Sequence, residues 1–345
     1  MSPLYSLKII AYGLFNTRFG KLILKSLSAF VSVKNLKKSN AEGKHPFIVS
    51  ITIDTESGYV RKNEHRVWQK SEPEAYIGFY KGMENWRSLL NKHNSKATFF
   101  LSTNCFSAKG EDHEKILKQL KLLLKEGHEI GLHMHPDSDL ALQISLKERF
   151  WHTSAGFYDY NKINQFIKAS KNLIQKNLGI NAVSFRWGNW ALNSDAAKAL
   201  QQSGFKFDSS ATPGIKGHIN DGMHYDWSKA NEHYPWRLSL KDYQNTKNQD
   251  SKIVEIPIAT FNFLGIALRA DPANSALLQA AFDYYYKNAD RSRKPFVFVI
   301  ISHSIEGTYD NGLKTKVIDI MDEFIAHAKK TKNVRFMSIK EAENL

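Results

Sequence analysis

Two histidines separated by one residue are the first feature of this sequence that could do chemistry. They lie in the segment GHEIGLHMHPD, residues 127–137, as His133 and His135. In an extended chain, side chains two residues apart point to the same face, so both imidazoles can reach one ion. Histidine pairs of this kind also occur in cores and on surfaces. The pair alone therefore leaves metal binding, core packing and surface exposure open.

Carboxylates that could complete a metal site follow an earlier apolar segment. FIVSITID, residues 47–54, ends in Asp54, and Glu56 follows on the same face. Two histidines and one carboxylate, with positions left for water, form a hydrolytic metal site. We expect the third ligand to be Asp54 or Glu56, with Asp137 as an alternative.

These residues must be positioned by the elements around them. Apolar, β-branched segments alternate with segments of helical periodicity along most of the chain. The expected strands are 47–54, 96–102, 128–135, 182–188, 205–210, 252–259, 295–304 and 334–339. The expected helices are 79–93, 112–127, 160–179, 193–204 and 311–330. This alternation predicts an α/β fold, a distorted or incomplete (β/α) barrel of seven or eight parallel strands.

Reactive residues fall where the expected strands end. In parallel barrels the chemistry sits at the carboxyl ends of the strands. Seven side chains are predicted to meet there: Asp54, Glu56, His133, His135, Arg186, Asp208 and His303. Placement of reactive types at the ends of five separate strands favours one shared site over packing roles.

The charge and the cysteine content limit which partners and which disulfides we expect for this protein. Lys and Arg number 48 against 34 Asp and Glu, a formal net charge of +14. This excess fits an anionic partner or a solvated basic surface. No nucleic-acid-binding motif accompanies the charge, so nucleic acid is not an expected partner. Cys105 is the single cysteine, which rules out an internal disulfide, and we expect it to be a buried thiol.

We expect residues 1–45 to form a basic amphipathic segment and a linker, ahead of the barrel domain over 46–345 with an insertion near 215–250. Phe15, Phe19 and Leu22 recur at helical spacing beside Arg18 and Lys21. The pattern predicts a helix that lies on an anionic membrane surface, through residues 1–38, or packs on the protein itself. The segment is too interrupted to span a bilayer and lacks the pattern of a secretory signal.

Taken in order, the segments resemble the polysaccharide deacetylases with a NodB homology domain, carbohydrate esterase family 4. ITIDTES resembles the first motif of that family, KATFFLS its following strand, and EGHEIGLHMHP the second motif. FRWGNWALNSDAAKALQQSGFKFDSS resembles the third motif and the aspartate of the fourth, and VFVIISHS the fifth. The resemblance covers roughly residues 46–305.

The sequence departs from the usual motifs in three places. Asp-Thr-Glu replaces adjacent aspartates, His-x-His replaces His-x-x-x-His, and no proline follows Arg186. The chain is therefore similar to a divergent branch of the family with Asp-x-Glu and His-x-His motifs. The resemblance implies a divalent ion, usually zinc, held by Glu56, His133 and His135. Whether Asp54, Glu56 or Asp137 completes the site stays open.

The resemblance also implies a role for each remaining residue. Asp54 is expected to be the general base, held in orientation by Arg186. His303 is expected to be the general acid, with Asp208 orienting it and raising its pKa. Trp187 and Trp190 are expected either to line a sugar subsite or to pack in the core.

The implied activity is hydrolysis of a linear amide that removes an N-acyl group, expected to be acetyl, from an amino sugar. We expect a glycan substrate, lipid-linked in surface polysaccharide or lipopolysaccharide biosynthesis, and a cytoplasmic enzyme at the inner face of a bacterial membrane. Two alternatives remain. One is hydrolysis of another C–N bond, in a cyclic amide or an N-formyl sugar, and the other is an inactive glycan-binding homologue.

Overall fold

The computed structural model describes residues 28–344 except 40–42, 58, 63–64, 69–75, 220–222, 249, 273–274 and 309–316. Most of the predicted amphipathic segment, residues 1–27, therefore lies outside the described residues. Its last part is a short 3-10 helix, η1 (Ser28–Phe30), followed by strand β1 (Val31–Ser32). Within the described ranges, no helix combines the length and apolarity needed to cross a membrane.

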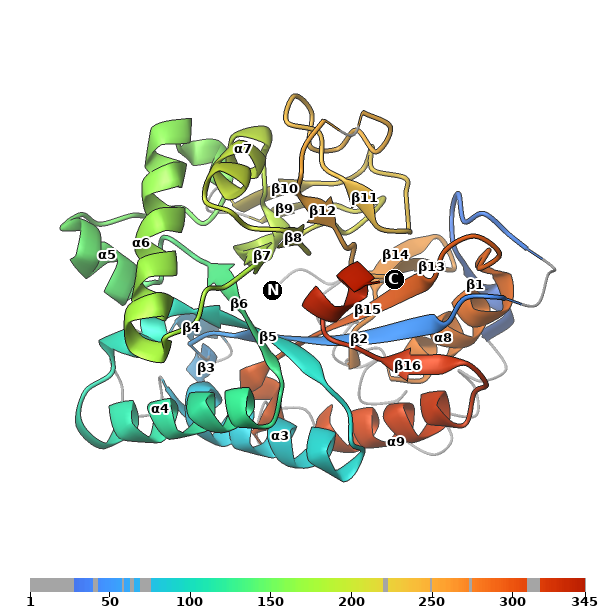
Figure 1. Ribbon diagram of the computed structural model, residues 1–345, viewed down its shortest axis with the longest axis horizontal. Helices are drawn as coiled ribbons and strands as arrows, with labels where there is room; N and C mark the ends of the chain where they lie inside the picture. The colour runs from blue at the N-terminus through green and yellow to red at the C-terminus, as the bar shows by residue number, and fades with distance from the viewer. Residues whose placement is uncertain are drawn as a thin grey trace.

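A curled, mostly parallel sheet forms the centre of the molecule (Figure 1). Its strands run in the order β11 (Trp236–Arg237), β12 (Val254–Glu255), β8 (Phe207–Asp208), β7 (Ser184–Trp187), β6 (Glu129–Met134), β5 (Ala97–Ser102), β2 (Phe47–Thr55) and β15 (Phe296–His303). A ninth described strand, β16 (Val334–Phe336), also pairs with β2. Only the β11–β12 pair at the edge is antiparallel in this described sheet.

The two ends of this sheet approach each other. Ile258, just beyond β12, forms a parallel bridge with Val299 of β15. Only this isolated bridge, among the described residues, joins the β12 end to β15, where a regular barrel would have a continuous ladder. The predicted distorted or incomplete barrel is confirmed, and β16 brings the described strand count to nine.

Helices cover the outside of the curled sheet (Figure 1). They are α3 (Met83–Lys92), α4 (Gly110–Lys125), α5 (Leu140–Leu146), α6 (Tyr160–Leu178), α7 (Ser194–Gln202), α8 (Ser275–Asn288) and α9 (Val317–Lys329). Capping side chains and a glycine set the ends of several of these helices. Asp159 and Asn193 accept hydrogen bonds from the first turns of α6 and α7, and Gly179 ends α6 in the left-handed conformation.

Smaller elements lie outside the central sheet. Two hairpins are β3 (Tyr59–Lys62) with β4 (His65–Trp68), and β9 (Lys216–Ile219) with β10 (Met223–Asp226). A three-stranded sheet joins β1 to β13 (Thr260–Phe263) and β14 (Ile266–Arg269). Short helices include the π-helix η2 (Gly78–Gly82) and the 3-10 helices η3 (Thr103–Ser107), η4 (Ala155–Phe157), η5 (Gly188–Trp190), η7 (Ser304–Gly307) and η8 (Lys340–Asn344). The predicted insertion near 215–250 contains β9, β10 and β11.

Strand β2 shows how the sequence builds the site. Phe47, Val49, Ile51 and Ile53 belong to the core between sheet and helices. The alternate positions point the other way, and they change from apolar Ile48 to Ser50, Thr52 and Asp54 toward the carboxyl end. The barrel interior is therefore apolar at one end of β2 and polar where the strand ends.

Candidate metal and catalytic site

Strand register brings the predicted residues to one edge of the sheet. Asp54 of β2 is the register partner of His303 on β15. His133 of β6 is the partner of Arg186 on β7. Asp208 of β8 lies one strand further on, opposite Phe185. The parallel pairing therefore gathers residues that are up to 249 positions apart, since 303 − 54 = 249.

Glu56, His133 and His135 form the cluster that could hold a metal ion. One ligand atom from each lies within 4.8 Å of the others, and all three residues are buried. Nε2 of His135 is 2.9 Å from Oε2 of Glu56, and Nε2 of His133 is 3.4 Å from the same oxygen. Within the described chain, that buried oxygen has no hydrogen bond of good geometry. An ion bonded to all three atoms would satisfy it.

Hydrogen bonds behind the imidazoles fix which nitrogen faces the cluster. Nδ1 of His133 lies 3.1 Å from the carbonyl oxygen of Arg186, which can only accept, so Nδ1 carries the proton. The Thr153 hydroxyl donates to Asp137 at 2.6 Å and so is free to accept from Nδ1 of His135, at 3.5 Å. Both Nε2 atoms therefore face the cluster, and each can offer a lone pair to a cation once it has given up any proton, as metal ligands do.

The local electrostatics favour positive charge at this cluster. Burial alone would raise the pKa of Glu56, but the charge of His135 and the close approach of both imidazoles hold it well below its usual range. Burial would lower the pKa of His135, but the charge and hydrogen bond of Glu56 raise it above its usual value. The site thus stabilises an anion that attracts a cation, and the residues present fit a divalent metal.

Close packing fixes the position of His135. A Cβ atom on Gly188, the residue after β7, would come within 2.4 Å of the His135 ring. Glycine is therefore required there, because the backbone of the 188–190 turn lies against the imidazole.

Asp54 and Arg186 form a buried ion pair beside the cluster. Nη1 of Arg186 donates to Oδ1 of Asp54 at 2.7 Å and to the Thr52 hydroxyl at 2.8 Å. Nε and Nη2 of Arg186 donate to the carbonyl and the hydroxyl of Ser209. The other oxygen of Asp54, Oδ2, lies 3.9 Å from Nε2 of His133. Asp54 therefore borders the cluster with one oxygen held and the other facing the ligands.

His303 approaches the same cluster from β15. Its Nε2 lies 3.9 Å from Oε1 of Glu56, and its Nδ1 lies 3.6 Å from Oε1 of Glu306. Burial would lower the pKa of His303. The hydrogen bond and charge of Glu306, with the charges of Glu56 and Asp54, instead raise it to about 10. A half-buried imidazolium next to the cluster can supply a proton.

The carboxylate that orients His303 is Glu306, and the prediction that Asp208 does so is wrong. Glu306 follows His303 by three residues and also accepts from the backbone N–H of His303 at 2.9 Å, in a capping box at the start of η7. Asp208 instead accepts from the hydroxyl of Ser210 at 2.8 Å. Asp208 lies at the end of the short strand β8, beside β12. Its carboxylate therefore interacts with Ser210 and with β12, and not with His303.

Asp208 belongs to a buried pair with Glu255 of β12. The two residues are register partners, both are fully buried, and their carboxyl groups are within hydrogen-bonding reach. Burial raises the pKa of Asp208, and burial together with the nearby Asp208 raises the pKa of Glu255 well above its usual range. Glu255 also accepts from the backbone N–H of Ala211 at 2.9 Å. The pair holds the Asp208–Ala211 segment, which in turn contacts Arg186 through Ser209.

Two further sequence-predicted residues have supporting positions. Asp137 lies on the far side of the His135 ring from Glu56, with Oδ1 3.9 Å from Nδ1. Trp187 is fully buried and donates to the carbonyl of Thr153 at 2.8 Å, so it packs in the core and does not line a sugar subsite. The ring of Trp190 is partly exposed, and the guanidinium of Arg269 stacks 3.8 Å from its centre.

Sequence reasoning missed Glu306, Glu255 and Thr153. Glu306 had a usable signal, the capping-box spacing after His303. Glu255 and Thr153 had none, because their importance comes from contacts with Asp208 and His135 across the fold.

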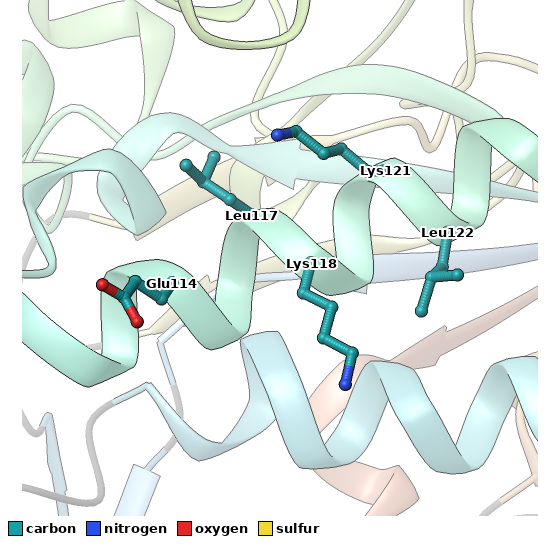
Figure 2. A pocket seen from close by; sticks show the side chains of 5 residues that line it. All are labelled: Glu114, Leu117, Lys118, Lys121 and Leu122. Carbon is teal, nitrogen blue, oxygen red and sulfur yellow. The ribbon is translucent and has the colours of Figure 1, made fainter.

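A hollow on the outer surface of α4 is chemically unlike this site. It is lined by Glu114, Leu117, Lys118, Lys121 and Leu122, whose side chains spread over successive turns of one helix (Figure 2). It contains one carboxylate and no histidine, and none of these residues comes from the edge where Asp54 and His133 lie. The hollow therefore has no part in the site described above.

Comparisons with known proteins agree with this architecture. Residues 71–207 match the sequence model of the family described as Polysaccharide deacetylase. This range includes His133, His135 and Arg186, whereas Asp54, Glu56 and His303 lie outside it. A search of curated proteins found no match.

Solved structures with a similar fold share little sequence with the chain. A putative polysaccharide deacetylase from Mycobacterium smegmatis has a TM-score of 0.56 and 16% identity, covering 89% of this chain and 94% of its own. A probable polysaccharide deacetylase from Pseudomonas aeruginosa PAO1 has a TM-score of 0.55 and 14% identity, covering 86% and 90%. The PuuE allantoinase has a TM-score of 0.56 and 13% identity, covering 89% and 92%. At these identities the likeness concerns the fold.

Proposed function

We propose that this chain is a member of the polysaccharide deacetylase family, whose model matches residues 71–207, and that it is a metal-dependent hydrolase that removes an N-acyl group from an amino sugar. The observation that carries the proposal is the buried Glu56–His133–His135 cluster, flanked by Asp54 and His303. The cluster offers one carboxylate and two imidazoles, and its neighbours offer a base and an acid. Hydrolysis of an amide requires this combination.

Glu56, His133 and His135 would hold the ion, and their mixed oxygen and nitrogen donors suit zinc. When bound, such an ion supplies Lewis acidity and makes water a better nucleophile at neutral pH. The hydrogen bonds to Arg186 and Thr153 keep the ligand rings in place before any ion arrives.

Asp54 takes the role of general base. Its Oδ1 is held by Arg186 and its Oδ2 faces the ligand cluster, within reach of a water molecule there. Arg186 holds Asp54 in place, because the pair is buried and the guanidinium is fixed by Thr52 and Ser209.

His303 takes the role of general acid. Its Nε2 faces Glu56, and Glu306 stabilises its protonated form. Amide cleavage needs a proton on the departing nitrogen, since an amine leaves far more readily than its anion. His303 can deliver that proton from Nε2 while its Nδ1 faces Glu306.

We further propose an acetylated, lipid-linked sugar as the substrate and the cytoplasmic face of a bacterial membrane as the location, in the assembly of a surface glycan. The support is the basic and amphipathic sequence at the N-terminus, which suits an anionic bilayer. This part depends on sequence alone and is separable from the chemistry.

Acetate release from N-acetylated glycans tests the chemical proposal. The full chain is loaded with zinc, and its metal content is measured together with acetate or formate release from N-acetyl and N-formyl sugar oligomers. We expect Asp54→Asn to keep the ion but lose about 10²–10⁴ in turnover, and Glu56→Gln to lose the ion as well. Ion binding without acyl release from any amino sugar would contradict the proposal, and ring opening of a cyclic amide under the same conditions would replace it.

A further inference from the structure

Three large apolar side chains are exposed at one end of the small β1–β13–β14 sheet. Phe30 is 55% exposed, Leu264 60% and Ile266 59%. Strand register explains why they lie together. Val31 pairs with Phe263 in an antiparallel ladder, so Phe30 follows on beside Leu264, and Phe263 pairs with Ile266 across the hairpin. We call Phe30, Leu264 and Ile266 the hairpin tip.

The turn of this hairpin holds a leucine in an unfavourable conformation. Leu264 and Gly265 have φ values of 50° and 84°, the left-handed region at both central positions of the turn. Such turns favour Asn or Gly at the first of these positions, because a branched side chain is strained there. A large apolar residue at this place gains little from packing, since most of its surface is exposed. A contact outside the described fold would explain its presence.

The chain that leads into the hairpin tip is strongly basic. Residues 1–41 contain seven Lys and Arg and no Asp or Glu. Residues 1–27 join the described fold at Ser28, two positions before Phe30. Lys34, three positions after Val31, is exposed, as are Lys37 and Lys38. An apolar projection on a stretch of sequence rich in cations has the composition of a surface that inserts into an anionic bilayer.

We propose that the hairpin tip inserts into the headgroup region of an anionic membrane. The inference rests on the membrane association proposed above and is independent of the catalytic chemistry. A bilayer fits better than a protein partner because the apolar side chains sit at a turn and project outward, where lipid can surround them. If the N-terminal segment packed on the hairpin tip as a helix, it would instead need an apolar surface that runs along the length of the helix.

A fluorophore at the hairpin tip gives a direct test. Cys105 is buried, and burial raises the pKa of its thiol well above the usual range, so it should not react with the label. Leu264→Cys in the full chain is labelled with a polarity-sensitive dye and mixed with vesicles of phosphatidylglycerol and phosphatidylcholine. Ile144→Cys is the matched control, because Ile144 is 63% exposed on α5, at the opposite end of the molecule from β13 and β14 (Figure 1).

We expect the dye at position 264 to brighten and shift to the blue with anionic vesicles, and the dye at 144 to remain unchanged. Equal responses at both positions would overturn the inference. A bright dye at 264 without vesicles would do so too, because it would show that residues 1–27 or a second copy cover the hairpin tip.

Serine substitutions separate this inference from the rest of the proposed function. The triple variant Phe30→Ser, Leu264→Ser, Ile266→Ser should bind anionic vesicles at least about tenfold more weakly, with unchanged turnover of a soluble N-acyl sugar. Ile144→Ser should bind as the parent does. If the parent binds and the triple variant binds equally well, the hairpin proposal is wrong while membrane association stands. If the parent does not bind, both fail and the deacylation is unaffected.

Discussion

Arg186 holds one oxygen of Asp54 at 2.7 Å, while the other oxygen of the same carboxylate faces His133 at 3.9 Å. Both residues are buried, and four donated hydrogen bonds fix the guanidinium: two from Nη1 and one each from Nε and Nη2. The guanidinium also stacks 4.4 Å from the ring centre of Phe100. This arrangement makes the position of Asp54 a property of the barrel interior, set before substrate or ion binds.

Removing the guanidinium should destabilise the fold as well as the site. Arg186→Met leaves Asp54 as a buried charge without its partner, and we expect a loss of about 3–5 kcal/mol in the free energy of unfolding. The double variant with Asp54→Asn should lose less than the sum of the two single changes, because no uncompensated charge remains. Denaturant titrations of the four proteins measure this coupling. Strict additivity would show that the pair does not interact.

Gly188 is not a ligand, but ion binding should depend on its lack of a side chain. In Gly188→Ala the new methyl group would meet the His135 ring, so the imidazole must shift. We expect zinc affinity to fall about 10–100-fold, as for other changes that disturb ligand support, measured by competition with a chelating dye. Gly156→Ala is the control, because nothing lies within 4 Å of a Cβ placed there. Equal affinities of the two variants would argue against the predicted role of His135 as a ligand.

Glu306 should set the alkaline limit of activity. The pKa of His303 is about 10 because Glu306 stabilises the imidazolium, so the proton donor stays charged at neutral pH and is lost only as pH rises toward that value. Glu306→Gln removes the negative charge, lowers the pKa of His303 and should move the alkaline fall of kcat/KM to lower pH. Near pH 9 we expect a loss of about tenfold.

The matched control for this prediction is Ser302→Ala, which removes one hydrogen bond to Glu306 and leaves its charge. Its pH profile should stay close to that of the parent. An unchanged alkaline limb in Glu306→Gln would mean that Glu306 does not tune His303.

The Asp208–Glu255 pair should make stability depend on pH. The pKa of Glu255 is raised in the folded state, so the folded chain keeps a proton that the unfolded chain releases. The pair's contribution to stability is therefore complete at acid pH and is lost as pH rises through the folded pKa. Glu255→Gln has no proton to lose and can still accept from Ala211.

We expect Glu255→Gln to melt within about a degree of the parent near pH 5 and a few degrees above it near pH 9. Scanning calorimetry across this range checks the sign. Glu255→Ala, which loses the acceptor for Ala211, should melt below the parent at both pH values. A parent more stable than Glu255→Gln at alkaline pH would exclude a shared proton.

The fold class and most of the site could be predicted because they follow from local patterns. Alternating apolar residues in 47–54 specify a strand, and reactive side chains at strand ends in a parallel barrel share an edge. The pair His133 and His135 follows from the two-residue period of a strand. The partner of His303 could not be found this way, because Asp208 lies at the end of another strand and the direction of its carboxylate depends on β12.

The amino-acid sequence by itself determined which side chains are available and that they gather at one edge of a curled parallel sheet, because periodicity and strand ends are local properties. Only the tertiary structure decided which of them touch. Glu56 meets both imidazoles, Glu306 replaces Asp208 beside His303, and Asp208 pairs with Glu255. Those contacts depend on register and side-chain direction between strands far apart in the chain, which packing of the whole barrel sets.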